Sequence, residues 1–256
     1  MPTTFDAAAV AALNQQFAGA TPQAVLEWAL QQPGLRFGLA SSFGAEDVVL
    51  IDMLWKLRHD ATVVTLDTLR LHTETYGVMD DVRRKYTNLD LRVYYPNLLT
   101  LDTFVKEHGY NCFYDSIDDR KACCGVRKVE PLDRALAELD AWATGMRRDQ
   151  ATTRTDIDRF EIDEVHAGML KLNPLADWTQ DQVWDYIRAN AVPYNPLHDA
   201  GFPSIGCAPC TRAVDPGEDP RAGRWWWELD PTAKECGIHI GYDAAGNAVI
   251  ERAAKG

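Results

Sequence analysis

Apolar residues recur along the chain with two alternating periods. Helical spacing is found over 7–17 and 22–31, where Thr21 and Pro22 open the second helix and Pro33 and Gly34 close it. Beyond residue 34, short apolar runs alternate with helical patterns. The expected strands are 35–40, 62–66, 91–95, 141–146, 160–165 and 169–174, and the expected helices are 45–58, 72–86, 100–108 and 179–190. This alternation predicts right-handed βαβ units in an α/β fold, a doubly wound and mostly parallel sheet with helices on both faces.

Two loops follow strands of this expected sheet. In such folds ligands bind beyond the carboxyl ends of the strands, near a change in strand order. The loop SSFGAED offers the hydroxyl groups of Ser41 and Ser42, the flexible backbone of Gly44 and the start of a helix, which together can bind an anion. An ordinary capped turn, with Glu46 and Asp47 complementing the helix dipole, explains the same residues equally well. It is not a Walker loop, because no GK[ST] follows.

The second loop, MRRDQATTR, carries Arg147, Arg148 and Arg154. Taken alone it reads as a solvated basic loop. Two anion-friendly loops after two strands of one sheet instead favour a phosphate or sulfate ligand.

Charge and composition restrict the kind of ligand. The net charge of -12 argues against a nucleic-acid partner but leaves room for a small anion in a local basic cluster. No apolar run approaches the ~20 residues of a membrane span. The segment MPTTFDAAAV lacks the pattern of a signal peptide. We therefore expect a soluble, cytoplasmic protein with no membrane partner, and leave a homo-oligomer open.

Four cysteines form the strongest motif of the chain. Cys123 and Cys124 are adjacent in KACCGVRK, and Cys207 and Cys210 form a CxxC in GCAPC. Four buried structural thiols are the simplest alternative, but a CxxC beside Gly and Pro is typical of ligand loops. Four thiolates suit zinc or an iron–sulfur cluster. An adjacent pair reaches one small ion only with strain, so geometry favours the cluster over zinc.

The C-terminal part of the sequence lacks the regular hydrophobic pattern of the preceding part. From about residue 213 periodicity fades, so we divide the chain into 1–212, with N-terminal helices in 1–33, and a segment 213–256. Cys236 stands near Lys234 and His239, whose positive charge lowers a thiol pKa, and beside Glu235, which opposes this.

With these motifs the chain resembles a known family, the iron–sulfur assimilatory adenylyl-sulfate (APS) reductases within the phosphoadenylyl-sulfate (PAPS) reductases. The matching stretches are SFGAEDVVLIDM, KACCGVRKVEPL, GMRRDQ, KLNPLADW, GCAPCTR, RAGRWWWE and KECGIH, and they extend over nearly the whole chain. The combination of CC, CxxC and the terminal ECGIH is specific, whereas no single loop is.

The resemblance implies an adenine-nucleotide α-hydrolase-like fold and a set of site residues. Nucleotide and substrate contacts would come from Ser41, Ser42, Gly44, Leu66, Asp67, Thr68, Arg147 and Arg148, and the sulfate would be surrounded by Lys128, Arg221, Arg224 and His239. Cys123, Cys124, Cys207 and Cys210 would bind one [4Fe-4S] cluster, and Cys236 would be the nucleophile. We expect KACCGVRK at the start of a helix, with Lys128 one turn beyond Cys124.

Two residues depart from the family pattern LDTG followed by RLHPET: Leu69 replaces the Gly and Thr73 the Pro. If the Gly position needs a positive φ, Leu69 strains the turn.

The resemblance and the chemistry together predict the activity. The Cys236 thiolate would attack the sulfur of APS and expel AMP, and thioredoxin or a glutaredoxin-like dithiol protein would then release sulfite, as in assimilatory sulfate reduction and cysteine biosynthesis. A PAPS or dual-specificity reductase stays open. An ATP-dependent tRNA thiolase of the same fold, or a non-enzymatic redox or metal sensor, fits the loops and the charge less well.

Overall fold

The computed structural model describes residues 5–150, 156–228, 241–242 and 248–249. Its α-helices are α1 (Ala7–Gln16), α2 (Pro22–Gln31), α3 (Ala45–Leu57), α4 (Thr73–Lys85), α5 (Leu98–His108), α6 (Ile117–Cys124), α7 (Glu130–Leu136) and α8 (Gln180–Asn190). Its strands are β1 (Phe37–Ser41), β2 (Thr62–Leu66), β3 (Asp90–Tyr94), β4 (Ala141–Ala143), β5 (Phe160–Asp163), β6 (Met169–Leu172), β7 (Gly241–Tyr242) and β8 (Ala248–Val249). The elements predicted from periodicity are all present, with ends that differ by a few residues.

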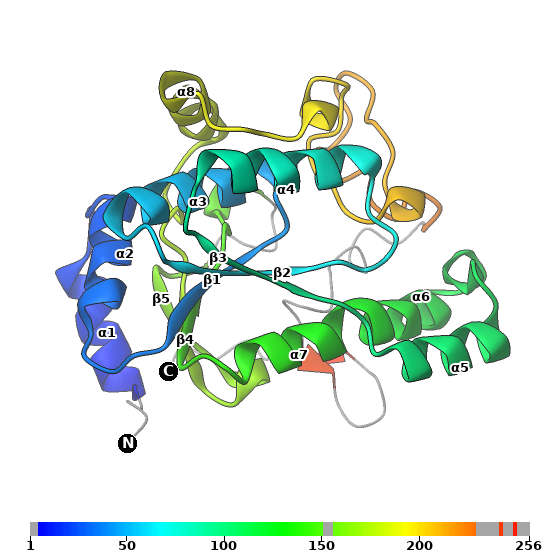
Figure 1. Cartoon of the computed structure of the whole chain (residues 1–256), viewed down its shortest axis with the longest axis horizontal. Coiled ribbons are helices and arrows are strands. Elements are labelled where there is room, and N and C mark those ends of the chain that lie inside the picture. The colour runs from blue at the N-terminus through cyan, green and yellow to red at the C-terminus, as the bar shows by residue number, and fades with distance from the viewer. Residues whose placement is uncertain (1–4, 151–155, 229–240, 243–247, 250–256) are drawn as a thin grey trace.

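A six-stranded sheet forms the centre of the molecule, in the order β3-β2-β1-β4-β6-β5 (Figure 1). All neighbours are parallel except β5, which returns antiparallel to β6 at the edge. From β1 the chain winds outward to β2 and β3 and then crosses back to β4 on the other side. The strand order therefore changes direction between β1 and β4, the place where such sheets bind ligands.

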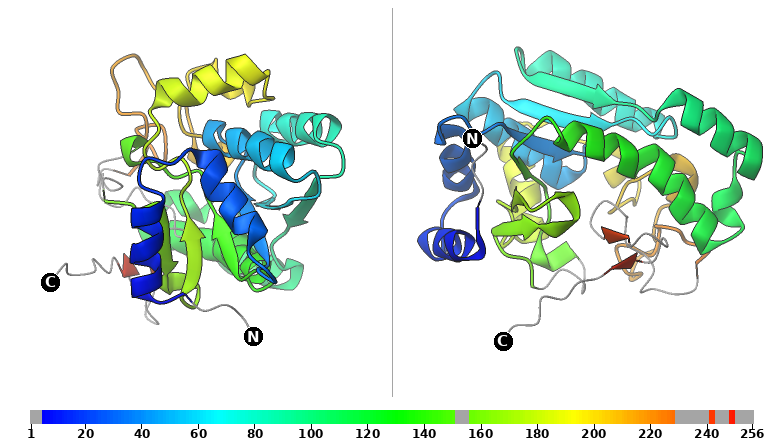
Figure 2. Two further views of the ribbon diagram at one scale, coloured as in Figure 1. Left: turned by 90° about the vertical axis from the view of Figure 1, so that its left-hand side faces the viewer. Right: turned by 90° about the horizontal axis from the view of Figure 1, so that it is seen from below.

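Helices cover both faces of the sheet, so the molecule has three layers (Figures 1 and 2). Helices α3 and α4 lie on one face with α8 packed outside α3, and α5, α6 and α7 lie on the other face. Helix α1 packs along β5 and α2 against α3. The central strands are covered on both sides, which explains why they read as continuous apolar runs in which Leu39 and Val63 are fully buried.

Helix ends follow local hydrogen bonding. Thr179 caps α8 through a full capping box with Gln182, as its position in the sequence predicts. Thr73 occupies the first position of α4, where the proline of the family pattern would also fit.

The stretch KACCGVRK is not at the start of a helix, so that expectation is wrong. Ser116 caps α6 by accepting a hydrogen bond from the amide of Asp119, and the helix ends at Cys124. A π-helical turn (Gly125–Val129) then joins it to α7. Polar residues fill the first turns of α6, so no apolar stripe marks its beginning in the sequence. Single π turns within helices are frequent at functional sites.

Among the described residues, no helix has both the length and the apolar character needed to span a membrane.

Candidate active site

A cavity of about 740 Å³ opens at the carboxyl ends of β1, β2 and β4. This volume lies in the range of small-molecule sites. The loops after β1 and β4, helix α8 and residues of the segment 198–224 all line it. The cavity therefore lies at the change in strand order and is lined by both loops that the sequence marked as anion-friendly.

The loop after β1 is held in a defined shape. Ser42 donates both its amide (2.6 Å) and its hydroxyl (2.8 Å) to one carboxylate oxygen of Asp47, and the amide of Phe43 donates to the Ser41 hydroxyl at 3.1 Å. Phe43 has a φ of 59° and is buried. Gly44 begins α3 without a side-chain cap. The first amides of α3 are thus not capped by a side chain at the edge of the cavity, an arrangement suited to a phosphate.

Asp47 is buried beneath this loop. Burial raises its pKa from 3.8 to about 6, although the hydrogen bonds from Ser42 act in the opposite direction. Gly145, in the loop after β4, approaches it so closely that a Cβ there would lie 2.5 Å from Asp47 Oδ1. Only glycine lets the two loops meet at this distance.

Arg147 ties the two loops together. Its guanidinium donates to Glu46 Oε1 at 2.9 Å and to the carbonyl oxygen of Trp178 at 3.1 Å, and the residue is almost fully buried. It also lines the cavity. Arg147 therefore fixes the loop geometry while presenting an edge to the ligand space.

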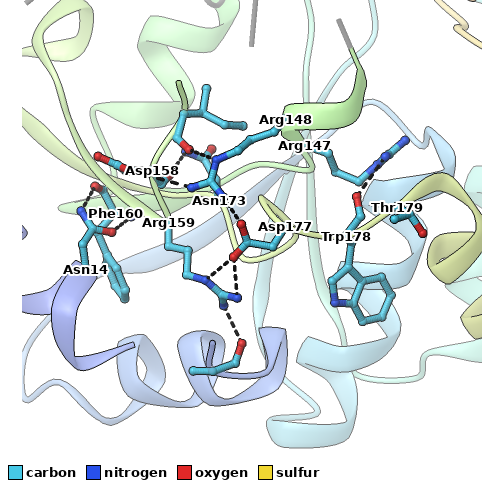
Figure 3. Close-up of polar contacts among 12 residues, drawn as sticks. Asn14, Arg147, Arg148, Asp158, Arg159, Phe160, Asn173, Asp177, Trp178 and Thr179 are labelled. Carbon is cyan, nitrogen blue, oxygen red and sulfur yellow. Dashed lines mark hydrogen bonds and ion pairs between the residues drawn. The ribbon is translucent and has the colours of Figure 1, made fainter. Parts of the chain in front are cut away.

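Arg148 points elsewhere (Figure 3). Its guanidinium contacts Asp177 and donates to the carbonyl oxygen of Ile157, and Arg159 binds the same Asp177 carboxylate at 3.0 Å. Arg148 does not line the cavity. Of the two arginines expected to clamp the substrate, the structure brings only Arg147 to the site.

Of the residues predicted to bind the nucleotide in the turn after β2, only some reach the cavity. Leu66 and Thr68 line the cavity, but Asp67 does not. Asp67 instead accepts hydrogen bonds from the amide of Leu69 (2.8 Å) and the hydroxyl of Tyr76 (2.9 Å). Asp67 thus holds the turn that presents Thr68. Leu69 has a φ of 59°, so the position does require the left-handed conformation that glycine favours.

Three predicted cations line the cavity: Lys128, Arg221 and Arg224. Arg224 is buried, and its Nη1 donates to the Ser204 hydroxyl at 3.2 Å. Its Nε is buried and has no hydrogen-bond partner among the described residues. The same cavity is therefore lined by these cations and by the loop after β1.

A second, smaller cavity collects the four motif cysteines. Cys123, Cys124, Cys207 and Cys210 all line it, together with Lys128, which lines both cavities. Burial raises the pKa of the Cys210 thiol to about 12, with Cys207 adding to the rise and Lys128 opposing it. Burial also raises the pKa of the Cys123 thiol, which Arg127 opposes. Thiols so buried keep their protons unless a metal centre or cations compensate the charge.

The CxxC loop is fixed by both neighbouring segments. Cys207 Sγ lies 3.2 Å from the Thr68 hydroxyl, and the amide of Ala208 donates to the carbonyl oxygen of Arg70 at 2.8 Å. On the other side the amide of Trp225 donates to the carbonyl oxygen of Cys210 at 3.1 Å. In the described part of the chain no three His, Cys, Asp or Glu side chains are placed to hold a single metal ion. The four thiols share one cavity without converging on one point.

Cys236 and His239 lie outside the described residues. Their predicted roles as nucleophile and sulfate ligand stay predictions.

Other residues of the cavity carried no signal in the sequence. Trp184 from α8, Tyr194 and His198 form one wall, with ring centroids 5.2 and 5.3 Å from that of Trp184. His198 Nε2 is buried without a partner among the described residues, and burial lowers the pKa of this imidazole. Only the fold brings these residues to the cavity.

The sheet order, the loop at the change in order and the adjoining basic cavity define a class, the α/β proteins of the adenine-nucleotide α-hydrolase group. Solved structures agree. A PAPS reductase from Candida auris, in a phosphate complex, superposes with a TM-score of 0.71 at 31% identity, over 84% of this chain and 100% of that one. A yeast FAD synthetase in complex with FAD shares the fold alone, with a TM-score of 0.52 at 13% identity, over 92% of each chain.

Sequence comparison narrows the class to a family. The model of the phosphoadenosine phosphosulfate reductase domain matches residues 36–213. The chain is 52% identical to an adenosine 5'-phosphosulfate reductase of Burkholderia cepacia, over 78% of this chain and 79% of that protein. A protein of the same name from Pseudomonas aeruginosa is 47% identical over 90% of this chain and 86% of its own length. The chain belongs to the phosphoadenosine phosphosulfate reductase domain family.

Proposed function

We propose that the chain reduces adenylyl sulfate to sulfite and AMP with electrons from thioredoxin or a glutaredoxin-like dithiol protein. One observation carries the proposal. A single cavity is lined both by Ser41, Ser42 and Gly44 of the loop before α3 and by the cations Lys128, Arg221 and Arg224, and the cysteine cavity adjoins it through Lys128. A nucleotide with an anionic sulfate on its phosphate matches this distribution of charge. The names of the relatives from Burkholderia and Pseudomonas support the same substrate.

The adenosine phosphate would lie over the loop of Ser41, Ser42 and Gly44, beside Leu66 and Thr68. The amides at the start of α3 would bind the phosphate, because the N-cap residue Gly44 has no side chain that caps them. The lining cations Lys128, Arg221 and Arg224 would bind the sulfate, joined by His239. Asp67, Arg147 and Arg148 would act on the shape of the loops rather than on the substrate, apart from the edge of Arg147 in the cavity.

The four cysteines fit a [4Fe-4S] cluster as a donor set. The four residues line one small cavity whose walls also contain Arg70, Arg120, Arg127 and Lys128. Four thiolates bound to a cluster leave a net negative charge, which these cations would compensate. An adjacent pair also suits a centre with separate irons better than a single zinc ion. When bound, the cluster would supply an electrostatic influence on Lys128, which reaches the substrate cavity.

The chemistry assigned to this chain falls on Cys236. Its thiolate would attack the sulfur of adenylyl sulfate, forming an S–S bond while the bond from sulfur to the phosphate oxygen breaks and AMP leaves. A thiolate of the dithiol partner would then attack Cys236 Sγ and release sulfite, and its second thiol would resolve the mixed disulfide. The partner ends as a disulfide, having supplied both electrons. Lys128, Arg221 and Arg224 would offset the repulsion between thiolate and sulfate.

The organisation into 1–212 and a catalytic segment 213–256 is part of this proposal. Residues 1–212 would bind the nucleotide and the cluster, and the rest would bring Cys236 to the sulfate. Thiolates needed for a cluster and for catalysis suit a reducing compartment, so we place the activity in the cytoplasm.

Anaerobic purification tests the proposal. We expect brown protein with four irons per chain that converts adenylyl sulfate and reduced thioredoxin to sulfite and AMP, and a competition between APS and PAPS would fix the preferred nucleotide. A colourless, zinc-loaded protein with full activity would refute the cluster, and absence of sulfite with either nucleotide would refute the activity.

A further inference from the structure

A buried ion pair links the cysteine-bearing helix to the chain that leads toward Cys236. Arg120 of α6 donates from Nε and Nη2 to the two carboxylate oxygens of Glu228, at 2.8 and 2.9 Å. Their side chains are only 1% and 3% exposed. Glu228 is the last residue of the described stretch that precedes Cys236. Withdrawing two charges this far from water is costly, so a bidentate pair at this depth needs a reason beyond stability.

Trp225 connects this pair to the substrate cavity. The guanidinium carbon of Arg120 lies 4.6 Å from the centre of the indole ring, and that of Arg224 lies 4.7 Å from it. The indole is 1% exposed and the residue has a φ of 43°, a conformation that tryptophan adopts only when its surroundings enforce it. The amide of Glu228 donates to the carbonyl oxygen of Trp225 at 2.9 Å. The pair and the strained tryptophan are thus one unit.

The two arginines of this unit face different cavities. Arg120 lines the cysteine cavity and Arg224 the substrate cavity. Among the described residues, the guanidinium of Arg224 is otherwise held by a hydrogen bond to Ser204 and by close contact with Gly206, where a Cβ would lie 2.5 Å from Nη2. The place of the Arg224 head group therefore depends on how Trp225 is held.

We propose that Arg120 and Glu228 are positioning residues of the reductase reaction. By fixing Trp225 they hold Arg224 at the point where the sulfate binds, and they fix the chain at Glu228, the last described residue before Cys236. This inference rests on the proposed function, because it takes Arg224 as a sulfate ligand. It adds that recognition of the sulfate, but not of the adenosine phosphate, depends on the Arg120–Glu228 pair.

Binding measurements in a Cys236→Ser background test this, since that variant cannot turn over. The full, cluster-loaded chain is compared with a variant carrying Arg120→Met and Glu228→Leu, because replacing both partners with apolar residues avoids an unpaired buried charge. Loss of a well-placed charged contact predicts a dissociation constant for adenylyl sulfate raised about tenfold. The constant for AMP, which lacks the sulfate, should change less than about twofold because no contact to it is lost.

The route through Arg224 is tested by a double-mutant cycle. In an Arg224→Ala background the pair replacement should cause no further loss of adenylyl sulfate affinity, because the contact it positions is gone. Glu228→Gln, which keeps the side-chain shape, serves as a second variant and should weaken adenylyl sulfate more than AMP. Arg159→Met is the matched control, since Arg159 is also a buried arginine paired with a carboxylate but lines neither cavity. It should leave the ratio of the two dissociation constants unchanged.

Equal weakening of adenylyl sulfate and AMP, or additive losses in the Arg224→Ala background, would overturn the positioning role and leave the pair as a structural contact. Iron content, measured on each variant, should stay at four per chain, and loss of iron that accounts for the weaker binding would also overturn it. If the Cys236→Ser parent does not distinguish adenylyl sulfate from AMP, the proposed function itself fails, and this shows before the pair is changed.

Discussion

Leu69 offers a direct test of how this chain tolerates its departure from the family pattern. Leu69 has a φ of 59°, and its backbone amide donates a hydrogen bond to the carboxylate of Asp67 in the same turn. A left-handed conformation costs a residue with a Cβ roughly 1–2 kcal/mol. Glycine avoids that cost but loses roughly 0.4–1 kcal/mol through the greater freedom of the unfolded chain. Leu69→Gly should therefore stabilise the protein by about 0.5–1 kcal/mol.

The side chain itself contributes little to the balance, because Leu69 is 44% exposed. The hydrogen bond to Asp67 comes from the backbone and survives the change. For a chain of this size the gain corresponds to a melting temperature raised by about 1–4 °C. Denaturant unfolding and thermal melts would measure it.

Leu69→Ala is the control, since it keeps the Cβ and hence the strain, and it should show no gain. Ala167→Gly, at an exposed residue with a φ of 57°, should gain a similar amount by the same reasoning. A Leu69→Gly protein that is no more stable than the parent, or an equal gain from Leu69→Ala, would refute the strain argument.

Three further predictions concern the loops. Gly145→Ala should destabilise the protein by about 1–3 kcal/mol and weaken AMP binding, because the added Cβ would lie 2.5 Å from Asp47 Oδ1. Thermal melts would measure the stability and AMP titration the affinity, and an unchanged stability and affinity would contradict the close approach of the two loops. Burial raises the pKa of Asp47 from 3.8 to about 6, so the stability it contributes is full below pH 3.8 and is lost as the pH rises through 6. Asp47→Asn should thus gain on the order of 3 kcal/mol relative to the parent between pH 4 and 7 in denaturant titrations, and a difference independent of pH would contradict this. Arg148→Ala should leave the KM for adenylyl sulfate within about twofold and cost under about 1 kcal/mol of stability, because the Arg148 side chain contacts Asp177 outside the cavity. A tenfold rise in KM would instead place Arg148 in the substrate site.

The fold could be predicted from the sequence because each central strand is buried on both faces. Apolar runs such as 62–66 are too short for a buried helix, which favours a strand, and β2 has those bounds. Helix α6 could not be predicted in this way. Its first turns are polar, and its buried residue is Arg120, whose place depends on Glu228 far along the chain. The antiparallel pairing of β5 with β6 at the edge of the sheet likewise had no local signal in the sequence.

Parts of the candidate site could also be predicted from local sequence features, and other parts could not. Glycines, adjacent cysteines and loops at strand ends are local features, so the sequence marked the loops and the thiols that line the two cavities. Which arginine of a pair faces the ligand depends on acidic partners distant in sequence. Glu46 holds Arg147 at the cavity, whereas Asp177 holds Arg148 away from it. The wall formed by Trp184 and His198 depends on how α8 packs on α3, which no local pattern reports.

The central claim is that Cys236 carries the sulfur between substrate and reductant. Incubating the cluster-loaded protein with 35S-labelled adenylyl sulfate and no reductant, followed by peptide mapping, tests it most directly. We predict one equivalent of label on the peptide containing Cys236, with one equivalent of AMP released, and loss of the label as sulfite when reduced thioredoxin is added. Label retained by a Cys236→Ser variant, or found on another cysteine, would contradict the account.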